Sequence, residues 1–450
     1  MLLYIKYTMK RGLLMSDKYT PCVIVPGIGQ SKVELVDCDG KKIKMAWQLD
    51  VDTEMIVKEL KMPLASSILL RRDAGLSKKM KSVIAEVVDP IATKDDGTMK
   101  NHVRVVTYPQ SLAQCTEDER AFIYRMVPMQ RLSKIIGEEN MYFFAYNSFG
   151  EPYETAKDLN DFIQKIKKER GCDKVNLVPV SLGGAVSIAY FDAYGSQNDI
   201  KRVMYFVAAL QGTPVISDLM AMNIKADKAL SLVEFLFPRK VAELLGKVLG
   251  MLPEKVANNF MYNSIEGILE PAIVRCPSMW STIPPEKYGE LSQKYLSDKK
   301  YSVLKEKTDR FYKAQKNFPE YVKTLMAQGT EFFAITGYNL PLMPIVASDT
   351  ISSDSMINIQ SASLGATAAP LGQKLNAENS EFISPDGTID ASTSLFGDRV
   401  WYFKDQQHDN TAYNDTALDV AARVLSDDSF VSVHSDPALP RFGNVQDNRK

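Results

Sequence analysis

Short apolar runs alternate with stretches of helical periodicity along much of the chain. β-Branched apolar runs bounded by turn residues predict buried strands, and apolar positions spaced three and four residues apart predict amphipathic helices. Strands of this kind separated by helices form βαβ units, in which a parallel sheet has helices on both faces. The pattern therefore predicts an α/β fold, with strands expected in 21–26, 141–146, 174–180, 200–210, 330–338 and 399–403 and helices in 151–170, 182–195 and 414–425.

Two stretches depart from this alternation. Residues 49–130 give mixed signals without a clean period, so we expect an irregular excursion there, after a hairpin centred on Asp39-Gly40. A second stretch has amphipathic and charged helical segments and predicts a helical insertion in the α/β core. The expected organisation is an N-terminal extension, the first part of the core, a helical cap or lid, the second part of the core and a polar C-terminal tail, at 1–20, 21–212, 213–328, 329–433 and 434–450.

Composition narrows the function classes. The 450 residues are 45% hydrophobic and 24% charged, and the net charge of -1 argues against a nucleic-acid partner. Five scattered cysteines without a Cys-x-x-Cys pair fit neither a disulfide framework nor a zinc site, and favour a reducing, cytoplasmic location. No run of eighteen apolar residues predicts a membrane span, and residues 1–20 have no clear signal-peptide pattern. We expect no metal and no cofactor, because three scattered histidines provide no ligand set.

A serine lies at the junction of a predicted strand and a predicted helix. In "NLVPVSLGGAV" the strand ends at Ser181, and Gly183 and Gly184 open the helix. A nucleophile elbow has this context and the pattern Gly-x-Ser-x-Gly, since strand and helix pass close together at such a turn. Pro179 replaces the first glycine, so an ordinary turn serine stays open as the alternative.

A serine hydroxyl becomes a good nucleophile when a neighbouring base accepts its proton. In proteins with a nucleophile elbow, the three residues follow the chain order Ser, Asp, His, and the histidine lies after the last strand. Of the three histidines in this chain, only His408 lies in that place. Asp386, in "SPDGTID", is the expected orienting carboxylate, with a simple Asp-Gly turn as the alternative interpretation. Its rivals are Asp349, Asp354 and Asp390.

An oxyanion hole needs two backbone N–H groups aimed at the position where negative charge develops. Leu182, which follows the serine, is one expected donor, and Ile28 in the glycine turn "VPGIGQS" is the other. The same turn is not a dinucleotide-binding fingerprint, because Lys32 stands where the third glycine is needed.

Together these segments resemble the lecithin-cholesterol acyltransferase family of α/β-hydrolases, which includes lipases, phospholipases and acyltransferases. The resemblance runs from about Pro21 to Leu425 and rests on the order and spacing of "VIVPGIGQSKVEL", "FFAYNSFGEPYETAKDLNDFI", "NLVPVSLGGAV", "QGTPV", "PSMWSTIPPEKY", "SPDGTID" and "QQHDN". It implies an α/β-hydrolase fold, a Ser181, Asp386 and His408 triad, oxyanion donors at Ile28 and Leu182, and a lid over an acyl-binding pocket.

Two positions depart from the family pattern. Val180 stands where histidine is frequent before the nucleophile, and "YNSF" at 146–149 replaces a Tyr-Asp-Trp-Arg run. These changes put lipid-headgroup specificity and acyl transfer in doubt more than ester cleavage.

The sequence thus predicts a serine hydrolase that cleaves acyl-lipid esters. Apolar residues such as Leu236, Leu244 and Leu245 suggest an apolar cap that contacts an acyl chain or, transiently, a lipid surface, although the same residues could simply pack the cap on the core. Acyl transfer to an alcohol, hydrolysis of amides and a catalytically silent scaffold remain alternatives.

Overall fold

A parallel β-sheet forms the centre of the protein. The computed structural model describes residues 19–444 except 48, 50, 226–227, 229–230, 232–233, 235–238 and 379. The predicted extension at 1–20 falls almost wholly outside the described residues. The sheet has seven strands in the order β12-β11-β8-β7-β6-β1-β5, all parallel to their neighbours. In chain order the strands are β1 (Cys22–Val25), β5 (Met141–Phe143), β6 (Val175–Pro179), β7 (Ile200–Phe206), β8 (Glu331–Tyr338), β11 (Val400–Lys404) and β12 (Phe442–Asn444).

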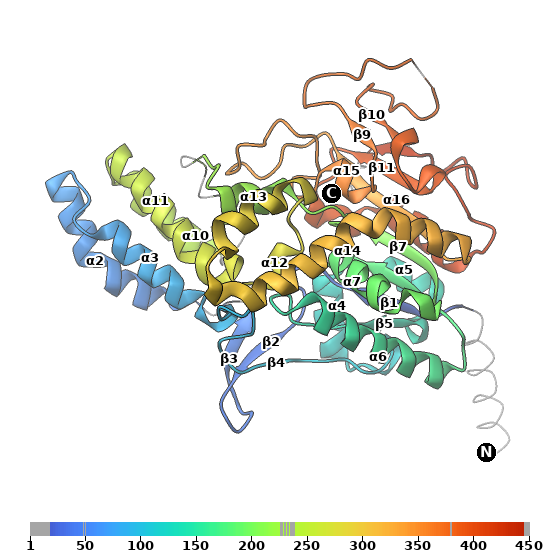
Figure 1. Ribbon diagram of the computed structural model, residues 1–450, viewed down its shortest axis with the longest axis horizontal. Helices are drawn as coiled ribbons and strands as arrows, with labels where there is room; N and C mark the ends of the chain where they lie inside the picture. Colours follow the sequence, from blue (N-terminus) through green and yellow to red (C-terminus); the bar gives the residue numbers. More distant parts are fainter. Residues whose placement is uncertain are drawn as a thin grey trace.

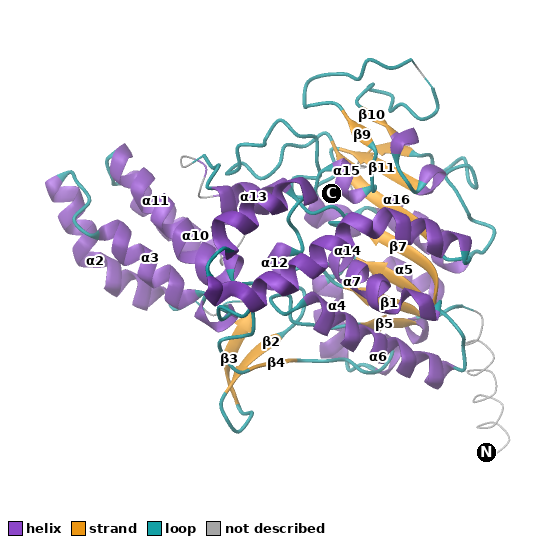
Figure 2. Ribbon diagram, in the orientation of Figure 1, coloured by secondary structure: helices purple, strands orange, loops and turns teal. Residues whose placement is uncertain are grey.

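Helices cover both faces of this sheet (Figures 1 and 2). Along β8, Phe332 and Ala334 belong to one buried cluster, whereas Phe333 and Ile335 belong to another, because successive side chains of a strand point to opposite faces. The first face packs against α6 (Pro152–Arg170), α7 (Gly183–Tyr194) and α14 (Ser302–Ala327). The second packs against α4 (Glu117–Met126), α5 (Gln130–Ile136) and α16 (Asp415–Ser426). The predicted α/β architecture, a parallel sheet with helices on both faces, is confirmed.

The region expected to be irregular contains long helices. α2 (Thr53–Leu70) and α3 (Leu76–Val87) form a helical hairpin, and α3 packs closely against α11 (Glu254–Ile268) of the predicted cap. The helices that pack together here therefore come from two separate parts of the chain. The predicted hairpin before it is confirmed, since β2 (Val33–Val36) and β3 (Lys42–Trp47) pair antiparallel, and β4 (Val103–Val105) completes a small second sheet.

The helical insertion divides between cap and core. α8 (Pro214–Ala221), α10 (Arg239–Gly250), α11, α12 (Pro277–Trp280) and α13 (Pro285–Leu296) share a buried cluster with α2 and α3. α14 contributes Leu304 to that cluster but places Phe311, Phe318 and Val322 against the sheet layer. The segment predicted as a cap, 213–328, therefore includes α14, a helix that packs against the core. Figure 1 shows the hairpin of α2 and α3 beside α10 and α11, projecting from the body of the molecule.

The remaining connections complete the core. The long segment after β8 contains α15 (Ile359–Ala362) and a small pair of strands, β9 (Thr367–Ala368) and β10 (Ile389–Asp390). The predicted polar tail at 434–450 includes β12, which pairs with β11 at the sheet edge. No described helix has both the length and the apolar character required to cross a bilayer.

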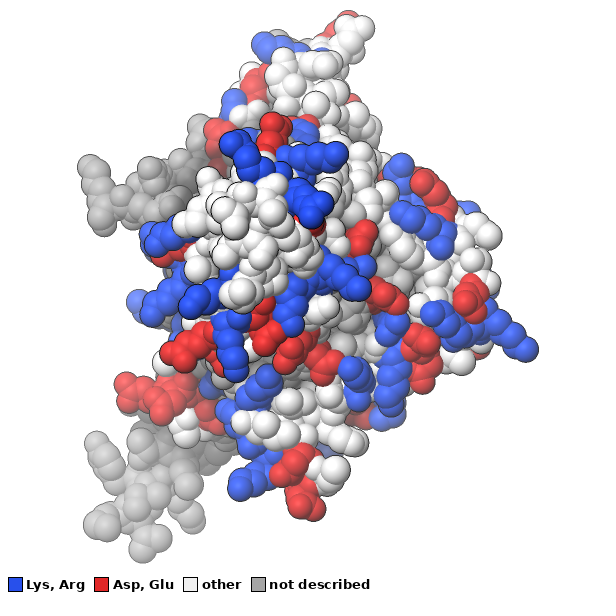
Figure 3. Space-filling model, turned by 90° about the vertical axis from the view of Figure 1, so that its left-hand side faces the viewer, with Lys and Arg blue, Asp and Glu red and all other residues white. Residues whose placement is uncertain are grey.

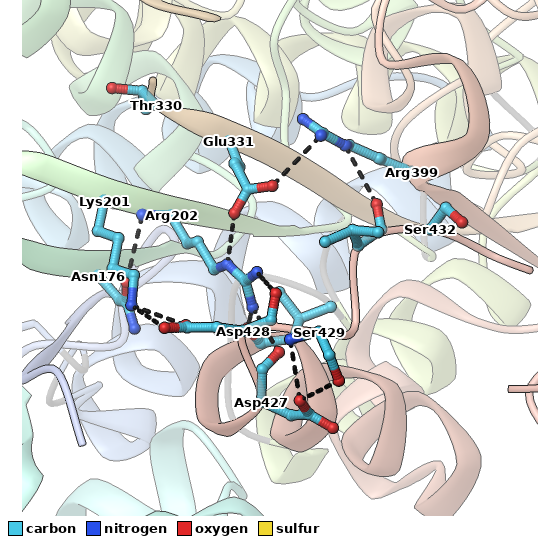
Figure 4. Close-up of polar contacts among 12 residues, drawn as sticks. Asn176, Lys201, Arg202, Thr330, Glu331, Arg399, Asp427, Asp428, Ser429 and Ser432 are labelled. Atoms are coloured by element: carbon cyan, nitrogen blue, oxygen red, sulfur yellow. Dashed lines mark hydrogen bonds and ion pairs between the residues drawn. The ribbon is translucent and has the colours of Figure 1, made fainter. Parts of the chain in front are cut away.

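A buried arginine connects the amino ends of two core strands with the carboxyl end of α16 (Figure 4). Arg202, at the start of β7, donates from Nε to Glu331 Oε2 at 2.7 Å and from Nη atoms to the carbonyls of Val424, Asp427 and Asp428. Arg399 pairs with the other oxygen of Glu331 at 3.2 Å. These bonds satisfy the buried guanidinium and tie β7, β8 and the end of α16 together.

Candidate active site

Ser181 lies at a sharp turn between β6 and α7, where the sheet meets the cap. Its φ of 52° is the left-handed conformation that a nucleophile elbow requires, and its N–H donates to Phe206 O at 3.0 Å. A Cβ on Gly183 would approach Val25 O to 2.3 Å, and one on Gly27 would approach Ser181 Cβ to 2.9 Å. The glycines therefore let α7 and the turn after β1 pass close to the serine.

Pro179 is the last residue of β6, an interior strand of the sheet. The β6–β7 ladder is irregular before it and resumes at Val180, which bridges Phe206. On the other side Val180 N donates to Val25 O at 2.9 Å. The N–H groups of Val180 and Ser181, which follow the proline, still bond to Val25 O and Phe206 O, so proline in place of glycine leaves these bonds intact.

His408 joins Ser181 to a buried carboxylate. The loop after β11 carries it, and His408 Nε2 lies 2.9 Å from Ser181 Oγ. On the other side of the ring, His408 Nδ1 lies 2.8 Å from Asp354 Oδ2. Its backbone N–H also donates to Asp354 O at 2.8 Å, so two bonds hold the histidine against this residue.

Asp354 is fully buried, and its carboxylate is satisfied by the local chain. Asp354 Oδ1 accepts from the backbone N–H groups of Met356 and Ile357 at 2.9 and 2.7 Å, which leaves Oδ2 for the histidine. A Cβ on Gly337 would lie 2.2 Å from Gln406 O and 3.0 Å from Asp354 Cβ. A glycine near the end of β8 therefore lets both the aspartate turn and the histidine loop approach the sheet.

Asp386 does not contact His408, so the prediction that Asp386 is the orienting carboxylate is wrong. Its Oδ1 accepts from the hydroxyls of Ser384 and Thr388 at 2.6 and 2.7 Å, and its Oδ2 pairs with Lys404 Nζ at 2.9 Å. Burial opposes ionisation, but these hydrogen bonds and Lys404 outweigh it and lower the pKa of Asp386 to about 2. Asp386 belongs to an Asp-Gly turn that Lys404 of β11 ties to the sheet, and a simple Asp-Gly turn is the alternative that the sequence left open.

The other candidates are also engaged elsewhere. Asp349 pairs with Lys225, and Asp390 caps a short helical turn through Ser392. His102 is exposed, and His434 lies beside Asp398 on the surface. Among the sequence candidates, the structure brings together Ser181, His408 and Asp354.

The electrostatics of His408 suit a general base. Burial of the ring disfavours its charged form, but the charge and hydrogen bond of Asp354 favour that form more strongly and raise the pKa of His408 above its usual value. In the neutral ring, the carboxylate of Asp354 favours the proton on Nδ1, which leaves Nε2 to accept from Ser181.

Ile28 and Leu182 flank the serine in the positions expected of oxyanion donors. Both line the same cavity as Ser181 and His408. Across the described part of the chain, no protein acceptor takes the backbone N–H of either residue. Two free donors beside the nucleophile are the arrangement that would stabilise a tetrahedral oxyanion.

Several side chains hold the Ile28 turn in place, and the sequence analysis did not single them out for this. Trp47 Nε1 donates to Gly29 O at 2.9 Å, and Gly29 N donates to Ser148 Oγ at 3.1 Å. Gln30 accepts from Gly27 N and donates to Met126 O. Ser148 belongs to the "YNSF" segment that departs from the family pattern, so the departure has a local structural role.

An apolar cavity of about 160 Å³ opens beside Ser181. Four methionines and several aliphatic residues line it, among them Met126, Met129, Ile216, Met279, Met356 and Ile357. Thioethers on unbranched side chains adapt to ligands of different shape. Neither Leu244 nor Leu245 lines this cavity: Leu245 is buried in the cap, and Leu236 lies outside the described residues.

Comparisons with known proteins give remote structural matches alone. No protein-family model matches the chain, and no curated protein sequence matches it. The solved structures that resemble it include a Tle4–Tli4 complex, with 13% identity, a TM-score of 0.36 and coverage of 90% of this chain and 97% of that one. They also include the phospholipase PlaB from Legionella pneumophila, with 13% identity, a TM-score of 0.35 and coverage of 74% and 60%. At such TM-scores the likeness carries no argument about activity.

Proposed function

We propose that this protein is a serine hydrolase that cleaves carboxylic esters of acyl lipids through an acyl-enzyme. The observation that carries the proposal is the chain of contacts from Ser181 Oγ to His408 Nε2 and from His408 Nδ1 to Asp354 Oδ2, at 2.9 and 2.8 Å. In this geometry the imidazole can accept the proton of the serine hydroxyl, and the buried carboxylate stabilises the imidazolium that forms.

The reaction proceeds in two steps. Ser181 Oγ bonds to the ester carbonyl carbon while its proton passes to His408 Nε2, and the N–H groups of Ile28 and Leu182 stabilise the oxyanion. His408 then returns the proton to the leaving alcohol as the carbon–oxygen bond breaks. Water, activated by the same imidazole, releases the acid from the acyl-enzyme. Asp354 fixes the ring orientation and stabilises the imidazolium.

The apolar, methionine-rich cavity supports an acyl substrate. Transfer of methylene groups from water to such a wall is favourable by about 0.8 kcal/mol each, so a longer acyl chain binds more tightly until the cavity is full. A short or medium chain matches the cavity, because a cavity of about 150 Å³ is known to accommodate a benzene-sized ligand.

A substrate series tests this proposal. Turnover is measured for 4-nitrophenyl esters with acyl chains of two to twelve carbons, and for the corresponding amides, with wild type and Ser181→Ala. We expect ester turnover that increases from the two-carbon to the medium-chain substrate and is lost in Ser181→Ala. Turnover of the two-carbon ester alone would contradict the acyl-lipid assignment, preferential cleavage of amides would favour a peptidase, and no turnover in wild type would favour a silent scaffold.

A further inference from the structure

The projecting end of the cap exposes apolar side chains that the buried cluster does not use. At the end of α2, Ile68, Leu69 and Leu70 are 38%, 83% and 51% exposed, and Met62 on the same helix is 71% exposed. Consecutive helical residues point in directions about 100° apart, so the last turn of α2 is apolar around much of its circumference. A helix with one apolar stripe would bury it against a neighbouring helix, but this end has no single stripe to bury.

Basic residues follow this apolar turn directly. Arg71 and Arg72 are exposed, and neither side chain has an ion-pair partner within the described residues. Residues 53–81 contain seven Lys or Arg and three Asp or Glu, and α10 beside them adds three basic residues and one acidic residue. Figure 3, which views the molecule from the side on which these helices project, shows blue Lys and Arg gathered around uncharged surface.

An apolar groove extends from this surface between α2 and α10. It has a volume of about 260 Å³ and is lined by Val57, Leu64 and Ile68 from α2 and by Leu244 and Val248 from α10. Val57 and Ile68 are both exposed, so the groove is continuous with the apolar end of α2.

We propose that the end of the α2–α3 hairpin, residues 68–72 with the adjoining groove, is a docking surface for an anionic lipid bilayer. Leu69 and Leu70 enter the acyl-chain boundary, and Arg71 and Arg72 remain at the level of the lipid phosphates, because long basic side chains keep their charge in the polar layer. A bilayer fits better than a protein groove, because a helix end that is apolar on several sides suits end-on insertion, and the excess of basic charge matches an anionic surface.

The surface deepens the proposed function, since it would bring a lipid hydrolase to its substrate, but its test is independent of catalysis. Sedimentation with vesicles of phosphatidylcholine alone, or with 30 mol% phosphatidylglycerol, is measured for Ser181→Ala. We expect binding to the anionic vesicles that weakens as salt increases. Leu69→Ser combined with Leu70→Ser should reduce the partition coefficient about tenfold or more, and Arg71→Gln combined with Arg72→Gln should reduce it about tenfold.

Matched variants on the core provide the controls. Ile135→Ser with Val431→Ser changes two exposed apolar residues elsewhere, and Lys134→Gln with Lys168→Gln removes two exposed charges; both pairs should bind vesicles as Ser181→Ala does. Absence of vesicle binding, equal binding to neutral vesicles, or binding that the α2 substitutions leave unchanged would overturn the proposal. A dimer in the absence of lipid that those substitutions dissociate would also overturn it, in favour of a second copy of the chain.

Discussion

Asp354 and Asp386 have different hydrogen-bond partners, and these imply different roles. The carboxylate of Asp354 has one oxygen fixed by two backbone N–H groups and the other directed at His408. Asp386 has its oxygens occupied by Ser384, Thr388 and Lys404. In our account the first orients an imidazole and the second stabilises a turn.

Substitution of the two aspartates separates these roles. Asp354→Asn keeps the volume but removes the charge that stabilises the imidazolium, so kcat for a medium-chain ester should fall by about 10³–10⁴-fold. Asp386→Asn is the matched control, and its kcat should remain within about threefold of wild type because surface-turn contacts do not reach the site. The reverse order of the two effects would restore Asp386 as the acid.

The pH dependence of hydrolysis reports on His408. The imidazole must be neutral to accept the Ser181 proton, so kcat/KM should fall as the pH decreases through the pKa of His408. Since Asp354 raises that pKa, the midpoint should lie above the usual histidine value of about 6.5. In Asp354→Asn burial, which lowers the pKa, is opposed only by the smaller effect of Asp409, so the midpoint of the residual activity should move to lower pH. A wild-type midpoint below 6.5, or no shift in the variant, would contradict this assignment.

Ser181 and His408 can be identified from the sequence more readily than Asp354. Ser181 has strand, glycine and helix context, and His408 is one of three histidines and the one that directly follows the predicted strand at 399–403. Asp354 lies in a polar segment with several rivals, and its approach to His408 depends on how that segment folds over β8. Gly337, a glycine within a strand, was the available signal, because such a position often marks a close backbone approach.

At the scale of elements, the serine turn depends on close contact between α7 and β1. The space beside Gly183 is filled by backbone on the β1 side, which cannot rotate away as a flexible side chain can. Any side chain there must displace the helix start, and Ser181 with it.

Gly183→Ala tests this contact. Overpacking at backbone should lower the free energy of unfolding by about 1–3 kcal/mol, and displacement of the serine should reduce kcat by at least about tenfold. Gly289→Ala on α13 is the control, since nothing lies within 4 Å of an added Cβ there; it should leave kcat unchanged and slightly raise the melting temperature. Wild-type kcat in Gly183→Ala would show that the elbow is less constrained than described.

Helices α2 and α14 show why the helices outside the strand–helix alternation were harder to predict than those of the core. α2 exposes Met62, Leu69 and Leu70, and these apolar residues on its outer side obscure the helical period that its buried face has. α14 has many charged residues on its exposed side, yet it buries Phe311 and Phe318 against the sheet layer. Periodicity indicates that a helix has an inner face, but not which body that face contacts.

At the scale of the whole molecule, the proposed catalytic residues and the Arg202 cluster lie at opposite ends of the sheet. Ser181 follows the carboxyl end of β6, whereas Arg202 and Glu331 begin β7 and β8. A change at the arginine cluster should therefore alter stability without altering chemistry.

Glu331→Gln tests that separation. It removes the charge that compensates the buried guanidinium of Arg202, and the free energy of unfolding should fall by about 2–4 kcal/mol. For a chain of this length the melting temperature should then decrease by about 3 °C. Differential scanning fluorimetry gives the shift, and ester hydrolysis at 25 °C should keep the wild-type kcat. A stable variant with reduced kcat would contradict the separation.

The central claim is that Ser181 is made nucleophilic by His408 and Asp354. Mass spectrometry of the protein after reaction with a fluorophosphonate measures this directly, since the reagent bonds to activated serines. We predict one adduct on the peptide that contains Ser181, none in Ser181→Ala, and much slower labelling in Asp354→Asn than in Asp386→Asn. An unlabelled wild type, or an adduct at another serine, would contradict the account.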